Sequence, residues 1–348
     1  MYFKGLRTHQ SRMSELGAGT QVFRCVQTLR SPRSARPRCF GNEHRTPGVS
    51  LQDLRDMCGA LVAVRDPFLD DNRVDAFTVR MGFEQMPSQA RPFRDLARTK
   101  ALLVDSASDA NPDFITPAYW VELLGCSLDE FVALSLFLHT GALYNGGVFR
   151  ASWLTQPNFE HIYEHLPREV IEQVSQSHFV LQRDRFRTVA EDHAQVDWRL
   201  RRYEFNPLLV GPFVELPGKD PIAPVLYPIL ARATPGSLYY TAVAKSGTAF
   251  TRALGVVFEH YVGRQLALCD SDVLISEIVY GRDSKKSVDH IMVMPGLIVL
   301  VEVKATPLSE GARLGAERLK ADLGRAPGKA VGQIEQTARL IESEHSAF

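Results

Sequence analysis

The sequence predicts an α/β protein in which a mainly α-helical region precedes a smaller C-terminal α/β domain. Three observations carry this prediction. Apolar residues recur at helical spacing from Pro92 to about Leu200. A strongly amphipathic helical pattern then covers Phe250 to Leu266. Two short apolar runs follow on either side of Met294-Pro295-Gly296, and the Pro-Gly pair suits a tight turn, so they predict a β-hairpin.

The composition is that of an ordinary globular protein. Of 348 residues, 45% are hydrophobic and 23% are charged, and 40 Lys and Arg balance 40 Asp and Glu. This balance argues against a protein that coats nucleic acid through its overall charge. Five scattered cysteines form no C-x-x-C pair, which favours a reducing, cytoplasmic setting over a zinc knuckle or a disulfide framework. No apolar run approaches the roughly 20 residues of a spanning helix, so no membrane partner is expected.

Four segments are predicted along the chain. Residues 1–50 carry nine Lys or Arg against two Glu, without apolar periodicity, and predict a basic, disordered tail. Residues 51–200 form the mainly helical region. Seven prolines among large apolar residues predict a packed, extended connector over residues 201–235. The C-terminal domain then covers residues 236–348.

Helix starts can be located inside the helical region. Thr116 followed by Pro117 predicts an N-cap and a first helical turn. Ser127 and Glu130 match the S-x-x-E capping box, and the following residues are apolar nearly all round. The helix after Ser127 is therefore predicted to be buried, and no catalytic motif is recognisable in this region.

The predicted hairpin brings three charged side chains to one end of an apolar sheet. Glu302 and Lys304 are two residues apart on one strand, so their side chains leave the same face. Asp289 lies at the far end of the other strand, and folding about the turn brings it beside Glu302. Two carboxylates and an ammonium held together are costly without compensation. A hard divalent cation such as Mg²⁺, bound by the carboxylates, would relieve their repulsion.

This arrangement resembles the PD-(D/E)xK nuclease superfamily, which has the restriction-endonuclease-like fold. Asp289, Glu302 and Lys304 match its Asp and its Glu-x-Lys, although Val288 stands where a Pro is usual. The resemblance covers about a third of the chain. It implies hydrolysis of phosphodiester bonds with Mg²⁺ or Mn²⁺; DNA is favoured as the substrate, and RNA stays open. It also implies that Asp289, Glu302 and the carbonyl of Val303 bind the metal, while Lys304 orients the attacking water.

Two further site residues are candidates through the same resemblance. Glu259, on the amphipathic helix, matches a glutamate that points at the metal site in many members, and a solvated helix residue is the alternative. Gln333 begins a segment similar to the Q-x-x-x-Y signature of RecB-type nucleases, with Thr337 in place of tyrosine. We expect Gln333 to flank the site.

The superfamily core runs helix, three strands, helix, strand. Val273–Tyr280 is predicted as the first strand, and the hairpin supplies the next two. No apolar run after the second helix can supply the last strand. The expectation is therefore a domain incomplete at its C-terminal end, either because the last strand comes from elsewhere or because the sequence is a fragment of a longer protein.

Two functions from other classes stay open. A degenerate nuclease fold would bind nucleic acid or a protein partner without cleaving anything. A helical protein-interaction module, with the C-terminal domain as its regulator, would place protein partners or oligomerisation in the N-terminal half. Magnesium-dependent cleavage of labelled DNA and RNA separates these functions from a nuclease.

Overall fold

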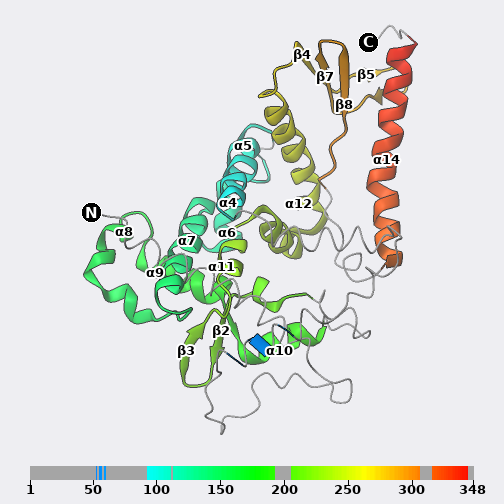
Figure 1. Cartoon of the computed structure of the whole chain (residues 1–348). Coiled ribbons are helices and arrows are strands. Elements are labelled where there is room, and N and C mark those ends of the chain that lie inside the picture. Colours follow the sequence, from blue (N-terminus) through cyan, green and yellow to red (C-terminus); the bar gives the residue numbers. More distant parts are fainter. Residues whose placement is uncertain are drawn as a thin grey trace. The chain divides into compact units, whose positions relative to one another are not determined.

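The protein is mixed α/β, in agreement with the predicted class (Figure 1). The computed structural model describes four long stretches and four single residues of the chain: 92–110, 113–192, 205–305 and 316–343, with Gln52, Arg55, Asp56 and Gly59. The predicted basic tail over residues 1–50 lies outside the described residues. No helix in the described stretches is long and apolar enough to cross a membrane.

Two compact units make up the described chain. The first contains Glu130–Ala233, and the second contains Phe93–Asp129 together with the chain from Thr234 onward. The sequence predicts residues 93–129 as part of the helical region, whereas the structure packs them with the C-terminal unit. Aromatic contacts explain this grouping, because the rings of Trp120 and Phe250 meet edge to face with centroids 6.4 Å apart.

The first unit packs helices against a three-stranded sheet of order β1-β2-β3. Phe131 and Leu134 of its longest helix are fully buried, in agreement with the prediction of a buried helix. β1 pairs parallel with β2, and β2 pairs antiparallel with β3. The elements are α7 (Leu128–Tyr144), η2 (Ala151–Thr155), η3 (Pro157–Phe159), α8 (Glu160–Tyr163), α9 (Arg168–Val174), η4 (Ser175–Phe179), β1 (Val180–Gln182), α10 (Arg183–Asp192), η6 (Pro207–Leu209), β2 (Phe213–Leu216), β3 (Lys219–Ile222) and α11 (Tyr227–Ala231).

The Pro-rich segment is part of this sheet. The sequence predicts an extended connector over residues 201–235, whereas β2 and β3 form a hairpin inside that range. Gly218 turns the hairpin with φ 68°, a backbone conformation that favours glycine. Pro221 is tolerated in β3 because this strand lies at the sheet edge. The prolines therefore mark turns and an edge strand.

One helix of the second unit, α6 (Pro117–Leu124), begins at the cap that the sequence predicts. The Thr116 side chain accepts a hydrogen bond of 3.1 Å from the amide of Tyr119, which confirms the predicted N-cap. The long helix breaks at Gly247, which has non-helical φ 53° and ψ −128°. The helices are α4 (Pro92–Lys100), η1 (Ala101–Asp105), α5 (Ser106–Ala110), α6 (Pro117–Leu124), α12 (Pro235–Leu266) and α14 (Ala316–Glu342).

The predicted hairpin is confirmed. β7 (His290–Met294) and β8 (Leu297–Val301) pair antiparallel about Pro295-Gly296, and Gly296 has φ 72°. β4 (Val273–Ser276) pairs with the other edge of β7. The predicted strand Val273–Tyr280 is split, because its last residues form β5 (Val279–Tyr280), which pairs with β6 (Lys285–Lys286) in a separate sheet. Among the described residues the larger sheet has three strands, of order β4-β7-β8.

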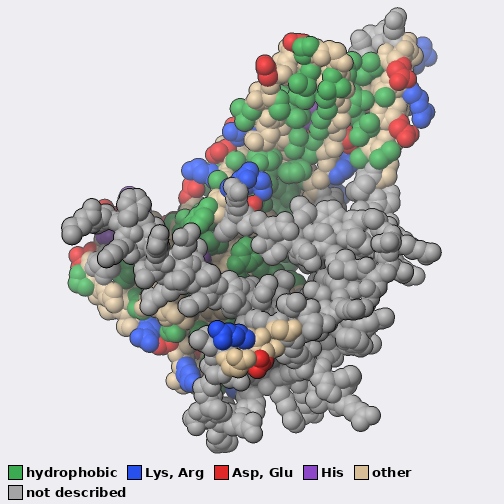
Figure 2. Space-filling model, viewed as in Figure 1, with side chains coloured by type: hydrophobic (Ala, Val, Ile, Leu, Met, Phe, Trp, Pro, Cys, Tyr) green, Lys and Arg blue, Asp and Glu red, His purple; other side chains and the backbone are tan. Residues whose placement is uncertain are grey.

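Helices α12 and α14 lie on either side of this sheet (Figure 1). The His290 side chain points at α12, where a Cβ added to Gly263 would stand 2.9 Å from the imidazole. Apolar side chains of the sheet are partly exposed, and Figure 2 shows hydrophobic atoms gathered over the strands. The exposed apolar residues of the sheet include Val273, Ile275 and Ile298. Asp289 and Glu302 follow the last pair of the β7–β8 ladder, at the end opposite the Pro295-Gly296 turn.

Candidate active site

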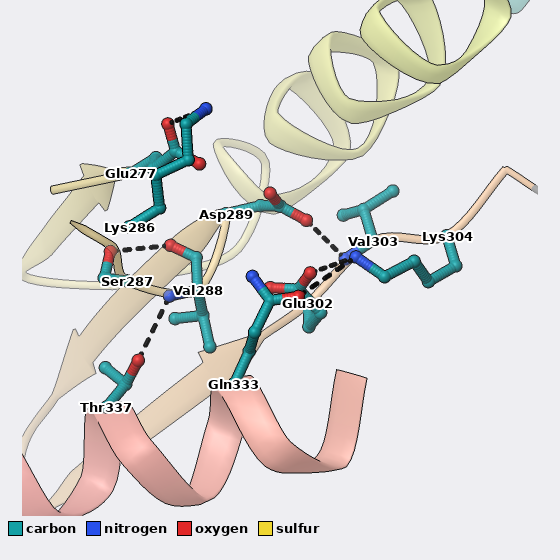
Figure 3. A network of polar contacts seen from close by, with 10 residues as sticks. All are labelled: Glu277, Lys286, Ser287, Val288, Asp289, Glu302, Val303, Lys304, Gln333 and Thr337. Carbon is teal, nitrogen blue, oxygen red and sulfur yellow. Dashed lines mark hydrogen bonds and ion pairs between the residues drawn. The ribbon is translucent and has the colours of Figure 1, made fainter. Parts of the chain in front are cut away.

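The open end of the hairpin brings Asp289 to the segment that contains Glu302. The last pair of the ladder is His290 with Val301, so Asp289 and Glu302 are the next residues on their strands. The backbone amide of Val303 donates a hydrogen bond of 2.6 Å to Asp289 Oδ2 (Figure 3). Asp289 is buried, at 8% exposure. The structure therefore joins Asp289 directly to the Glu302-Val303-Lys304 segment.

Glu302 and Lys304 contact each other, as expected for side chains two residues apart on one strand. Lys304 Nζ donates to Glu302 Oε1. The Glu302 side chain is 1% exposed and that of Lys304 is 34% exposed. The second oxygen, Glu302 Oε2, is buried and has no hydrogen-bond partner within the described part of the chain. A buried carboxylate oxygen of this kind is costly unless a cation or a donor satisfies it.

Helix α14 reaches the same place with Gln333. Lys304 Nζ donates to Gln333 Oε1 at 3.4 Å, so the ammonium lies between Glu302 and Gln333 (Figure 3). One helical turn further, Thr337 Oγ1 accepts a hydrogen bond of 3.1 Å from the amide of Val288. Gln333 thus lies beside the candidate residues. In the sequence, Thr337 stands out only because it replaces the tyrosine of the Q-x-x-x-Y signature. In the structure, its hydroxyl contacts Val288, the residue before Asp289.

Glu259 lies on α12 within electrostatic range of Asp289. Burial raises the pKa of the Glu259 carboxyl, and the negative charges of Asp289 and Glu277 raise it further. The positive charges of His290 and Lys286 oppose this rise in the pKa. Glu259 is half-buried on α12.

Two contacts near the site were not predicted from the sequence. The imidazole Nε2 of buried His290 lies 3.2 Å from the carbonyl oxygen of Glu259. Lys286 forms an ion pair of 2.9 Å with Glu277, and this hydrogen bond and charge raise the pKa of Lys286. Strand alternation could have predicted the direction of His290. The residue after Asp289 must point to the opposite face of the sheet, which is the face toward α12.

The metal-ligand set is small. No group of three or more His, Cys, Asp or Glu is arranged to hold a metal ion in the stretches that the structure describes. The candidate ligands are therefore two carboxylates, Asp289 and Glu302, with the carbonyl of Val303. This set fits magnesium, which prefers oxygen ligands and keeps several waters when one or two carboxylates bind it. The unpartnered Glu302 Oε2 is the observation that favours a cation here.

Comparisons with known proteins do not extend this description. No family model matches the sequence, and no curated protein or solved structure matches the chain. The function must therefore be argued from the residues at the open end of the hairpin and from the helices that contact them.

Proposed function

We propose that the C-terminal unit is a metal-dependent nuclease of the PD-(D/E)xK type, with the restriction-endonuclease-like fold, that hydrolyses phosphodiester bonds in DNA. The observation that carries this proposal is the 2.6 Å hydrogen bond between the Val303 amide and Asp289 Oδ2. It fixes the Asp of the motif to the Glu-x-Lys segment. The order of helix α12, strands β4, β7 and β8, and helix α14 is consistent with this fold.

Asp289, Glu302 and the carbonyl of Val303 would hold Mg²⁺ or Mn²⁺. When bound, the ion supplies a Lewis acid and lowers the pKa of water. Glu302 suits this role because its side chain is 1% exposed and one of its oxygens lacks a partner among the described residues. Besides burial, the charge of Asp289 raises the pKa of Glu259, so the two carboxyl groups are close to each other. Glu259 would bind a second ion or orient the first.

Lys304 would act on the water and on the phosphate. Its ammonium is held between Glu302 Oε1 and Gln333 Oε1, with about a third of its side chain exposed. A cation fixed in this way can orient the attacking water and stabilise the negative charge that builds up on the phosphate. Gln333 limits the positions that the long side chain can take, so it serves as a site-flanking residue.

The proposal includes DNA as the substrate and the cytoplasm as the location of the protein. The chain reaches the site through the exposed turn 281–284 and strand β6, which include Arg282 and Lys285. Cations on an exposed turn can contact phosphates without reading bases. We therefore expect cleavage with little dependence on base sequence.

The test is cleavage of labelled DNA and RNA by the full chain in Mg²⁺, in Mn²⁺ and in EDTA. Lys304→Ala and Glu302→Gln should each lower the rate about 100-fold or more. The matched control is Glu122→Gln, which breaks the 2.8 Å ion pair between Glu122 and Lys245 elsewhere in the unit and should leave the rate unchanged. Cleavage that persists in EDTA or in Lys304→Ala would refute the assignment.

A second candidate function is binding of nucleic acid without cleavage. It is favoured by the exposed cations Arg282 and Lys285, which can contact phosphates without a metal ion. The same experiment separates the two functions. A chain that retards labelled DNA in a gel yet leaves it intact in both metals supports the second function and contradicts the first.

A further inference from the structure

Two hydroxyl groups hold the backbone of Val288, the residue before Asp289. The Val288 amide donates to Thr337 Oγ1 at 3.1 Å, and Ser287 Oγ donates to the Val288 carbonyl at 2.9 Å (Figure 3). Val288 and Ser287 are completely buried. The pairing of β7 with its neighbours begins only at His290. The pairing of β5 with β6 ends one residue earlier, where the Ser287 amide donates to the Ile278 carbonyl at 2.9 Å. Between these two ladders, the hydroxyls of Ser287 and Thr337 hold the backbone of Val288, next to Asp289.

Thr337 connects this backbone to the helix that also contacts Lys304. Thr337 is 1% exposed and lies four residues after Gln333, so both side chains leave one face of α14. Gln333 contacts Lys304, while Thr337 contacts Val288. Between them, Gln336 donates a hydrogen bond of 2.7 Å to the hydroxyl of Tyr280. One helix therefore binds both strand ends that carry the candidate residues.

We propose that Thr337 is a positioning residue that sets the place of Asp289 relative to Lys304, an inference that rests on the proposed nuclease function. Removal of the hydroxyl leaves the buried Val288 amide without its acceptor, and such a group must move or recruit water. Asp289 is covalently next to Val288, so it moves with it. Loss of its position weakens metal binding and the chemical step, whereas binding of DNA elsewhere on the surface is unaffected.

The experiment compares Thr337→Val, which keeps the shape and removes the hydroxyl, with Thr337→Ser, which keeps the hydroxyl. The matched control is Thr99→Val, because Thr99 is a buried helical threonine whose hydroxyl donates to the backbone carbonyl of Asp95, in its own helix, at 3.1 Å. For each variant we measure kcat, KM for a labelled DNA, the Mg²⁺ concentration at half-maximal rate, and the melting temperature with and without Mg²⁺.

Thr337→Val should lower kcat or raise the half-saturating Mg²⁺ concentration about 10- to 100-fold, with KM for DNA unchanged. Thr337→Ser should restore wild-type values, and Thr99→Val should match the wild type in activity. Equal behaviour of Thr337→Val and Thr99→Val in a cleaving protein would overturn the role of Thr337 and leave the nuclease proposal intact. Loss of activity in Thr337→Ser equal to that in Thr337→Val would also overturn it.

The remaining outcomes are equally decisive. If Thr337→Val does not fold, Thr337→Cys keeps a weaker acceptor, and activity per folded molecule must then fall below that of Thr337→Ser. Equal activity of these two variants would contradict the proposal. If the wild type neither cleaves nucleic acid nor gains melting temperature with Mg²⁺, the nuclease proposal and the role of Thr337 fall together.

Discussion

Asp289 accepts a 2.6 Å hydrogen bond from the amide of Val303, so the carboxylate at the start of one strand is fixed to the end of the next. This contact involves an ionised acceptor and a backbone donor, a pair stronger than two neutral groups. It also means that Asp289 has a structural role in addition to any role as a ligand. Substitutions at Asp289 must therefore be chosen so that the two roles can be separated.

Asp289→Asn and Asp289→Ala separate them. The amide oxygen of Asn can still accept from Val303, so Asp289→Asn should change the metal-free stability by no more than about 1 kcal/mol. Asp289→Ala leaves the Val303 amide without this acceptor and should cost about 1–3 kcal/mol. Urea denaturation in EDTA measures both values. Equal losses in the two variants would contradict the assignment of the hydrogen bond to Asp289.

The pair Gly263 and Gly255 tests the packing of His290 against α12. A Cβ at Gly263 would stand 2.9 Å from the His290 ring, whereas a Cβ at Gly255 would meet nothing within 4 Å. Gly263→Ala should therefore destabilise the protein by about 1–3 kcal/mol through overpacking. Gly255→Ala should stabilise it by about 0.5–1 kcal/mol through helix propensity. Thermal melts of the two variants should shift in opposite directions.

Glu259 predicts a pH dependence of stability. Burial and the charge of Asp289 raise its pKa above the ordinary value of 4.5, so the folded protein binds the proton more tightly than the unfolded chain. The charged carboxylate then lowers stability as pH rises from the unfolded pKa through the folded pKa. Glu259→Gln removes this effect. The difference in free energy of unfolding between Glu259→Gln and the wild type should therefore favour the variant more at about pH 7 than at about pH 4.

Urea denaturation of wild type and Glu259→Gln at the two pH values checks this sign. Glu122→Gln serves as the control at an exposed position, where the carboxylate pairs with Lys245. A difference between Glu259→Gln and the wild type that stays constant with pH would contradict the effect of burial on Glu259.

Gln333 and Gln336 offer a comparison within one helix. Gln333→Ala frees the Lys304 ammonium from its contact with Gln333 Oε1 and should lower the cleavage rate about 10-fold. Gln336→Ala removes the bond to the Tyr280 hydroxyl, which should cost about 1 kcal/mol of stability and leave the rate unchanged. Rates per folded molecule distinguish the two. Equal rates in both variants would show that Gln333 has no part in placing Lys304.

Local sequence patterns predicted the parts of the site that lie on one hairpin. The Pro295-Gly296 turn sets the register, and strand alternation places Glu302 and Lys304 on one face, as their contact shows. The same local rules located the N-cap at Thr116. Each of these features depends on residues close together in the sequence.

Several contacts between residues far apart in the sequence were not predicted. β1 pairs with β2, yet Val180 and its partner Phe213 are separated by a helix and a Pro-rich segment. The bond from Val288 to Thr337 joins positions 49 residues apart, through a side chain whose type is common in helices of any kind. Glu277 and Ile278 separate β4 from β5. The pattern of apolar residues continues across these two positions, so the sequence predicts one strand.

The central claim is that Asp289 and Glu302 share one divalent ion. It is tested most directly by the melting temperature of the full chain as Mg²⁺ is titrated, for the wild type, Asp289→Asn and Glu302→Gln, with Glu122→Gln as control. A ligand that binds only the folded state at 100 times its Kd stabilises it by about 2.7 kcal/mol. We predict a rise in melting temperature that grows with Mg²⁺ in the wild type and in Glu122→Gln, and that is largely lost in both site variants. Equal Mg²⁺ shifts in all four proteins would contradict a shared metal site at Asp289 and Glu302.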